Sequence, residues 1–316
     1  MKKEIWPICS FNFTLWNAAR TEMQQVKEQI DVMVKDCAVN TVNFTIGAHQ
    51  EHTYSTLIDW KGSHMPKDTD MTDLFRYAKE KGLKRIMKPM LNPTDGYWRG
   101  FIHFFNEDVP CEPKWSDWFK NYTEYMVHYA ELCEKEEIEM LIIGCEMVGT
   151  DHRADEWRNL VAEVKKVYSG LVTYNCDKYQ EHNVKWWDAC DVISSSGYYP
   201  VQDWTNQISR IEAVVKHYDL PFFFSEVGCP STTDSANIPN DWTLVGKKPV
   251  SQEEQEKFFE TMFTFCEPLH WHYGYSIWDW PANVRPNYDA ETDGGYSVFG
   301  KSAEKLIKKV FNNHAL

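Results

Sequence analysis

Short apolar runs alternate with amphipathic stretches along the whole of this 316-residue chain, and this alternation limits its fold more than any other feature. Continuous apolar runs are typical of parallel strands buried on both faces. We expect strands at 5–13, 41–47, 84–90, 140–146, 170–175, 191–197, 221–226 and 273–279. Eight successive strand and helix units predict an α/β protein, a (β/α)8 or TIM barrel.

The stretches between these runs carry the helical period. In the first, Met23, Val26 and Ile30 recur at steps of three and four residues. Ser251, followed by acidic residues, is a good N-cap for the helix expected at 251–266. Helices are expected at 20–39, 70–81, 115–137, 154–168, 204–218, 251–266 and 302–313, with a short one at 184–189. No linker or further repeat interrupts the pattern, so residues 1–316 are expected to form one catalytic barrel domain.

The charge and the cysteines restrict the partners and the compartment. With 47 acidic and 33 basic residues the net charge is −14, which disfavours nucleic acid and anionic membranes and favours a neutral polymer. No apolar run reaches membrane-spanning length, and the start lacks the apolar stretch of a signal peptide, so we expect a cytoplasmic protein. The nine cysteines are scattered without a CxxC pair and are expected to be free thiols.

Two glutamates at the ends of predicted strands carry the strongest functional signal. Glu146 closes the fourth strand and Glu226 closes the seventh. The carboxyl ends of barrel strands meet at one face, where active sites are built, so the two side chains should face each other across the barrel mouth. A carboxylic acid opposite a carboxylate suits glycoside cleavage: one protonates the departing oxygen and the other attacks the anomeric carbon.

Several local motifs resemble those of glycoside hydrolase family 113, the β-1,4-mannanases, within the large clan of retaining (β/α)8 glycoside hydrolases. They are Ile143-Gly-Cys-Glu-Met147, Trp186-Trp-Asp188 before Asp191-Val-Ile-Ser-Ser-Ser-Gly-Tyr-Tyr-Pro200, Phe224-Ser-Glu-Val-Gly228, Trp278-Asp-Trp280 and Tyr296-Ser-Val-Phe-Gly-Lys-Ser-Ala-Glu304. The resemblance covers nearly the whole chain.

By this resemblance Glu146 is the acid/base and Glu226 is the nucleophile. Most members of the wider clan carry an asparagine directly before the acid/base, where its amide bonds the sugar 2-hydroxyl, but this chain has Cys145. A thiol is a poor donor, so another residue must take that contact. The candidates are Lys88, Asn175 and His49.

Other candidate substrate-binding residues follow from their places at strand ends. Either Tyr198 or Tyr199 is expected to bond the Glu226 carboxylate, while the other packs beside Pro200. Lys88 either binds a sugar hydroxyl or pairs with a rim carboxylate. Trp278 and Trp280 alternate, so we expect both to point to the same side, one of them as the floor for the cleaved sugar. Trp16 and Gln50 follow the first and second strands and are further candidates for ligand contact.

Long segments after strands, at 49–70, 92–114 and 228–250, are expected to shape the cleft. The resemblance implies hydrolysis of β-1,4-mannosidic bonds in manno-oligosaccharides and mannan fragments with retention of configuration, with transglycosylation as a side activity and no cofactor. The alternatives are a β-1,4-glucanase or other β-glycosidase of the clan, and a sugar-binding barrel without catalysis. A metal site is not expected, because His270-Trp-His272 precedes the last strand and so belongs to the opposite face.

Overall fold

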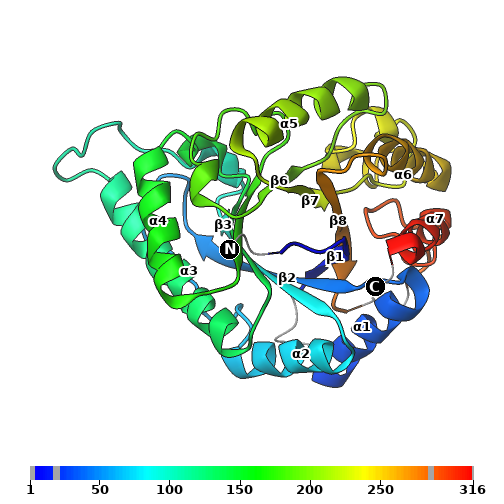
Figure 1. Ribbon diagram of the computed structural model, residues 1–316, viewed down its shortest axis with the longest axis horizontal. Helices are drawn as coiled ribbons and strands as arrows, with labels where there is room; N and C mark the ends of the chain where they lie inside the picture. Colours follow the sequence, from blue (N-terminus) through cyan, green and yellow to red (C-terminus); the bar gives the residue numbers. More distant parts are fainter. Residues whose placement is uncertain (1–3, 17–21, 284–287, 315–316) are drawn as a thin grey trace.

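Eight parallel strands close into a barrel in their chain order in the computed structural model, which describes residues 4–16, 22–283 and 288–314 (Figure 1). The strands are β1 (Ile8–Thr14), β2 (Thr41–Gln50), β3 (Lys84–Pro93), β4 (Met140–Cys145), β5 (Leu171–Cys176), β6 (Ile193–Ser196), β7 (Phe222–Val227) and β8 (His272–Pro281). The predicted (β/α)8 class and all eight strands are confirmed.

Helices form a ring outside the barrel (Figure 1). In the described part of the chain they are α1 (Met23–Cys37), α2 (Asp68–Glu80), α3 (Trp115–Lys135), α4 (Ala154–Val167), α5 (Trp204–Tyr218), α6 (Gln252–Cys266) and α7 (Ser302–Phe311). Between β5 and β6 the short helix expected at 184–189 is only a 3₁₀ turn, η4 (Trp187–Ala189). The expected start of the first helix at Arg20 lies outside the described residues.

The helices dock by the apolar stripes that the sequence predicts. On α1, Val26, Ile30 and Met33 are fully buried against the barrel. Burying one such side chain stabilises the fold by ~1.5–3 kcal/mol. The Ser251 hydroxyl accepts the Glu254 backbone N–H at the start of α6, as expected for an N-cap.

The inside of the barrel changes character from one end to the other. Its amino-terminal half is filled by an apolar cluster of Trp6, Ile8, Ile86, Met140, Ile142, Leu171, Val192 and Phe223. Above it lies a polar layer in which the Asn43 amide donates to Asn12 Oδ1 (3.2 Å) and to Ser276 Oγ (2.9 Å). These hydrogen bonds connect β1, β2 and β8 beneath the carboxyl-terminal end of the barrel.

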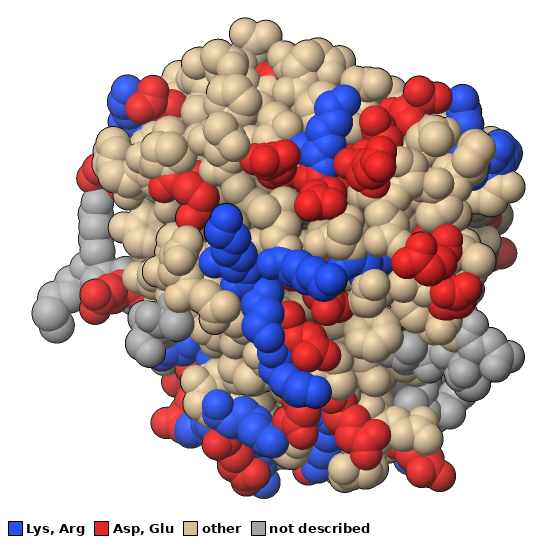
Figure 2. Space-filling model, turned by 90° about the vertical axis from the view of Figure 1, so that its right-hand side faces the viewer, with Lys and Arg blue, Asp and Glu red and all other residues tan. Residues whose placement is uncertain are grey.

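All nine cysteines lie within the described residues and are free thiols, as predicted. Acidic and basic side chains are interspersed over the face shown in Figure 2. None of the helices in the described ranges has the length and apolar character needed to cross a membrane.

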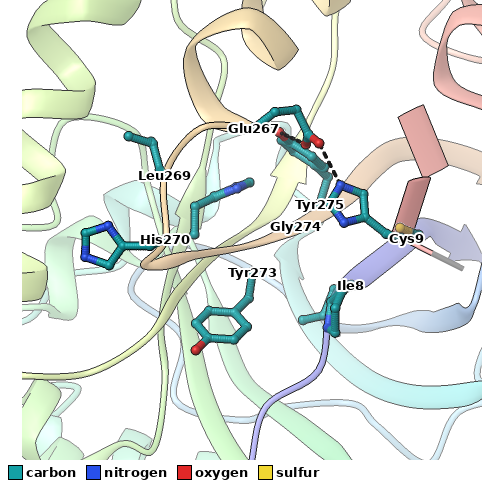
Figure 3. Close-up of a pocket in the computed structure, with 11 residues that line it drawn as sticks. Ile8, Cys9, Glu267, Leu269, His270, Tyr273, Gly274 and Tyr275 are labelled. Carbon is teal, nitrogen blue, oxygen red and sulfur yellow. Dashed lines mark hydrogen bonds and ion pairs between the residues drawn. The ribbon is translucent and has the colours of Figure 1, made fainter. Parts of the chain in front are cut away.

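A cavity of about 250 Å³ at the amino-terminal ends of β1 and β8 contains His270 and His272 (Figure 3). There Glu267 accepts the Tyr275 hydroxyl (2.8 Å) and pairs with His314 (2.6 Å). The two histidines therefore lie at the end of the barrel opposite to the rim glutamates. Within residues 4–16, 22–283 and 288–314 no group of three or more His, Cys, Asp or Glu side chains is arranged to hold a metal ion.

Candidate active site

Both rim glutamates follow an irregularity in the strand pairing. Between Ile142 and Cys145, β4 has one residue more than its partner stretch on β5, and Glu146 comes next. Between Phe224 and Glu226, β7 has one residue more than β6. Such bulges bend a strand and re-aim the following side chain. The extra residues thus set the direction of both carboxylates.

Glu226 is held from two sides by buried groups. Lys88 Nζ, on β3, lies 2.6 Å from Glu226 Oε2, and the Tyr198 hydroxyl donates to Oε1 at 2.7 Å. Asn12 in turn accepts a bond from Lys88 Nζ (3.0 Å), which fixes the ammonium group. The predicted tyrosine bond to the carboxylate is present, and Lys88 makes the predicted pair with a rim carboxylate.

The charges around Glu226 favour its ionised form. Burial of this carboxyl raises its pKa, but the positive charges of Lys88 and Arg99 outweigh burial, so the pKa lies below its ordinary value. The Tyr198 phenol contributes in the same direction through its hydrogen bond. A carboxylate that is ionised and fixed on both oxygens suits a nucleophile.

Glu146 is held by a different pair of groups. Ser196 Oγ, at the end of β6, donates to Glu146 Oε1 at 2.6 Å, and Arg99 Nη1 lies 2.9 Å from Oε2. Arg99 belongs to the short 3₁₀ turn η2 (Arg99–Phe101) after β3 and is anchored by two bonds to Asn92 Oδ1. The Glu146 backbone has φ of 51°, a left-handed conformation that is uncommon for residues other than glycine and that concentrates at functional sites.

Cys145 joins the two carboxylate environments. Its thiol donates to Glu226 Oε2 at 3.5 Å and lies 3.9 Å from Arg99 Nη1, the same nitrogen that contacts Glu146. Burial raises the pKa of Cys145 well above its ordinary value, so the thiol keeps its proton and acts as a donor. One thiol and one guanidinium nitrogen thus connect the two glutamates across the barrel mouth.

Trp278 lies beside this pair, but Trp280 does not. Trp278 belongs to a buried cluster with Cys145 and Tyr198, and Lys88 Nζ is 5.7 Å from the centre of its ring. Trp280 is fully buried against Phe11 and bonds Gln29 on α1. The expectation that both tryptophans point to the same side is wrong, because β8 has one extra residue opposite β1 between the pairs Phe11–Ile277 and Phe13–Trp280.

A cavity of about 370 Å³ extends from the rim of β1 and β8 and is lined by the predicted Trp16 and Trp280. Trp16 and Trp242 are both exposed, and the Trp242 ring lies 4.3 Å from that of Tyr296. Asp279 also lines this cavity, where burial raises its pKa to about 7. Exposed indole rings beside polar groups form a surface of the kind that binds sugar rings.

The remaining candidates are engaged elsewhere. His49 stacks on His64 with ring centres 4.0 Å apart. Gln50 is buried, and its amide bonds the His52 carbonyl and the Trp118 indole. Tyr199 donates to the buried Glu181 and packs on Trp204. No hydrogen bond or ion pair joins any of these three side chains to Glu146 or Glu226 in the described part of the chain, and His49 is partly exposed.

Asn175 has an indirect place in the site. Its amide donates to Ser196 Oγ (3.0 Å), the hydroxyl that in turn bonds Glu146, and its backbone carbonyl accepts the Glu146 N–H (2.7 Å). It therefore positions the hydroxyl and the backbone that hold Glu146.

Sequence reasoning missed Arg99, Ser196 and Asp177. Ser196 had a signal, since three serines end an otherwise apolar strand. Asp177 follows β5, and burial and the charge of Glu146 raise its pKa to about 7. Arg99 comes from a long irregular segment, where no periodicity indicates which side chain turns inward.

A closed (β/α)8 barrel with two opposed, differently held carboxylates at its carboxyl-terminal mouth defines a glycoside hydrolase. Residues 10–301 match the profile described as Glycoside Hydrolase Family 113, and the chain belongs to this family.

Solved structures agree over the full length. The chain is 45% identical to a structure described as a GH113 β-1,4-mannanase, with a TM-score of 0.94 and coverage of 98% of this chain and 99% of that one. It is 32% identical to the GH113 β-mannanase of Alicyclobacillus acidocaldarius in complex with ManMIm, with a TM-score of 0.92 and 99% of both chains covered. A β-glucuronidase of Ruminococcus gnavus, 13% identical with a TM-score of 0.65 over 98% of this chain and 50% of that one, shares the fold alone. A search of curated proteins gave no match.

Proposed function

We propose that this protein hydrolyses β-1,4-mannosidic bonds in manno-oligosaccharides and mannan fragments with retention of configuration, with Glu226 as nucleophile and Glu146 as acid/base. The observation that carries the proposal is the separate support of the two carboxylates: Lys88 and Tyr198 hold Glu226, whereas Ser196 and Arg99 hold Glu146. The β-1,4-mannanases among the similar structures support the choice of mannosidic bonds.

In the first step Glu146 gives its proton to the glycosidic oxygen while Glu226 attacks the anomeric carbon. The bond to the leaving sugar breaks, and an ester to Glu226 forms. Tyr198 and Lys88 fix the two Glu226 oxygens, so the carboxylate needs little rearrangement to reach the anomeric carbon.

In the second step Glu146, now ionised, takes a proton from water, and the resulting hydroxide displaces Glu226. Arg99 Nη1 lies 2.9 Å from Glu146 Oε2 and Ser196 Oγ bonds Oε1, so the carboxyl group stays in place between the two steps. A sugar hydroxyl that replaces water gives transglycosylation by the same chemistry.

Among the candidates for the sugar 2-hydroxyl contact, Lys88 has the best support. Of the three candidates Lys88, Asn175 and His49, Lys88 lies within hydrogen-bond distance of the nucleophile Glu226. The Asn175 amide is used by Ser196 and by the Cys176 carbonyl.

We further propose that the protein acts in the cytoplasm, where it meets oligosaccharides. Its free thiols support a reducing compartment.

The test is incubation with mannohexaose and with cellohexaose, followed by proton NMR of the first products. We expect mannohexaose alone to be shortened, with the β-anomer released first. Release of the α-anomer first would contradict retention. Preferred cleavage of cellohexaose would assign a glucanase, and binding of mannohexaose without cleavage would assign a sugar-binding barrel.

A further inference from the structure

The segment between β3 and α3 carries a row of exposed aromatic side chains that the catalytic pair does not use. In this segment Phe101, His103 and Phe105 are exposed, while Ile102 and Phe104 between them are buried. All three side chains therefore reach solvent from this segment, and the His103 ring also packs on Trp115 and His152, with ring centres 5.5 and 5.8 Å apart. Phe101 and Phe105 are 61% and 60% exposed, and neighbouring exposed apolar rings of this kind are typical of an interaction surface.

This row begins at the acid/base. The Trp98 indole donates to Glu146 Oε2 at 3.4 Å, and its ring packs edge-on against Phe101 with centres 5.7 Å apart. The next residue, Arg99, pairs with the same carboxylate oxygen. The exposed rings therefore continue directly from the group that contacts the scissile bond.

The far end of the row opens into a cavity. About 450 Å³ of space lies between Tyr54, from the segment after β2, and His103, Phe104, Phe105, Glu112 and Pro113. Tyr54 is 56% exposed and stacks on His52 with ring centres 5.0 Å apart. Aromatic faces with a carboxylate and an imidazole at the edge suit a ring that carries both C–H faces and hydroxyls.

The segment is also fixed to the catalytic strand. Gly149, three residues after Glu146, packs so closely on it that a Cβ there would lie 2.2 Å from the Ile102 carbonyl oxygen. The buried side chain of Phe104 packs on Trp115 of α3. In Figure 1 the blue-green loop extends outward past α3 and α4. Because the backbone at Ile102 and the side chain of Phe104 are fixed in this way, the rings next to them need little ordering when a ligand binds.

We propose that Trp98, Phe101, His103, Phe105 and Tyr54, here called the outer aromatic strip, bind the sugar units of a β-1,4-mannan chain that lie beyond the cleaved bond. This inference rests on the proposed function and specifies it, because it gives the enzyme a preference for longer chains. A mannan chain is chosen as occupant because the strip is continuous with Glu146 and because its rings suit the C–H faces of a neutral sugar polymer.

The test uses the double variant Tyr54→Ala, Phe105→Ala, whose two side chains lie at the far end of the strip. We expect the ratio of kcat/KM for mannohexaose to kcat/KM for mannotriose to fall about 5- to 100-fold, from the usual contribution of two aromatic contacts. The conservative pair Tyr54→Phe, Phe105→Tyr keeps both rings and should keep the ratio. Phe265→Ala removes a ring that is 36% exposed near the end of α6 and serves as the matched control.

If the double variant is active and its ratio is unchanged, the strip does not bind the substrate and the inference is wrong, while the proposed function is unaffected. A wild-type protein inactive on both substrates would instead overturn the proposed function. If light scattering shows a wild-type dimer that the double variant dissociates, the strip is a self-association surface and the inference is wrong.

Discussion

The Lys88 ammonium group lies 2.6 Å from Glu226 Oε2, and the side chains of both residues are buried. This ion pair spans the barrel mouth from β3 to β7. An unpaired carboxylate at such a depth would take up a proton, because burial favours the neutral acid. Lys88 is therefore the main reason that Glu226 is available as a nucleophile.

Lys88→Met should move the acidic limb of the pH profile. Since Lys88 lowers the pKa of Glu226 against the effect of burial, its removal raises that pKa. Glu226 must be ionised to attack. On acidification the variant should therefore lose activity at a higher pH than the wild-type protein does. We expect the acidic limb of kcat/KM to move up by about one pH unit or more. Lys81→Met, which removes an exposed lysine paired with Asp31, is the control; an unshifted limb in Lys88→Met would contradict the role.

Glu226→Ala should abolish turnover, because no covalent intermediate forms without the carboxylate. Azide enters the vacated space and attacks the anomeric carbon from the face that Glu226 used. Added azide should restore part of the activity on an activated aryl mannoside, and NMR should identify a glycosyl azide of inverted configuration. Undiminished hydrolysis in this variant would rule out Glu226 as nucleophile, and Glu212→Ala on α5 controls for unspecific effects.

Sequence patterns predict the fold and the place of the two rim glutamates correctly, because both depend on strong local signals. Buried parallel strands are continuous apolar runs, and a carboxylate at the end of such a run stands out. The sequence does not show which of Tyr198 and Tyr199 bonds Glu226. Neighbouring side chains in a strand point to opposite faces, but the pattern does not indicate which of the two faces the barrel mouth. The relative direction of Trp278 and Trp280 was not predictable, because a bulge in β8 adds one residue and pairing irregularities have no reliable sequence signal. Arg99 reaches Glu146 from an irregular segment, so only tertiary packing reveals it.

Glu146→Ala should show a loss that depends on the leaving group. Natural mannosides need a proton on the departing oxygen, so kcat/KM on mannohexaose should fall by about two to four decades. A dinitrophenyl glycoside leaves without protonation and should lose much less in its first step. Stopped-flow release of dinitrophenol, compared with steady-state hydrolysis of mannohexaose, measures both effects in one variant. Equal losses on the two substrates would remove the acid/base role.

Asp151→Asn should make the protein more stable at alkaline pH. Asp151 is buried after Glu146, its Oδ1 accepts the Tyr174 hydroxyl (2.6 Å), and burial raises its pKa from 3.8 to about 8. The folded protein thus keeps a proton that the unfolded chain releases near pH 4, so stability falls as the pH rises from about 4 to about 8. Asparagine does not titrate, so the variant does not lose stability in this way. The free energy of unfolding of the variant minus that of the wild type should therefore grow between about pH 4 and about pH 8. A shift of one pKa unit corresponds to about 1.4 kcal/mol, so the growth should reach up to several kcal/mol. Urea unfolding at pH 5 and pH 9 measures it, with the exposed Asp155→Asn as control; a difference independent of pH would show that Asp151 is already ionised in the folded protein.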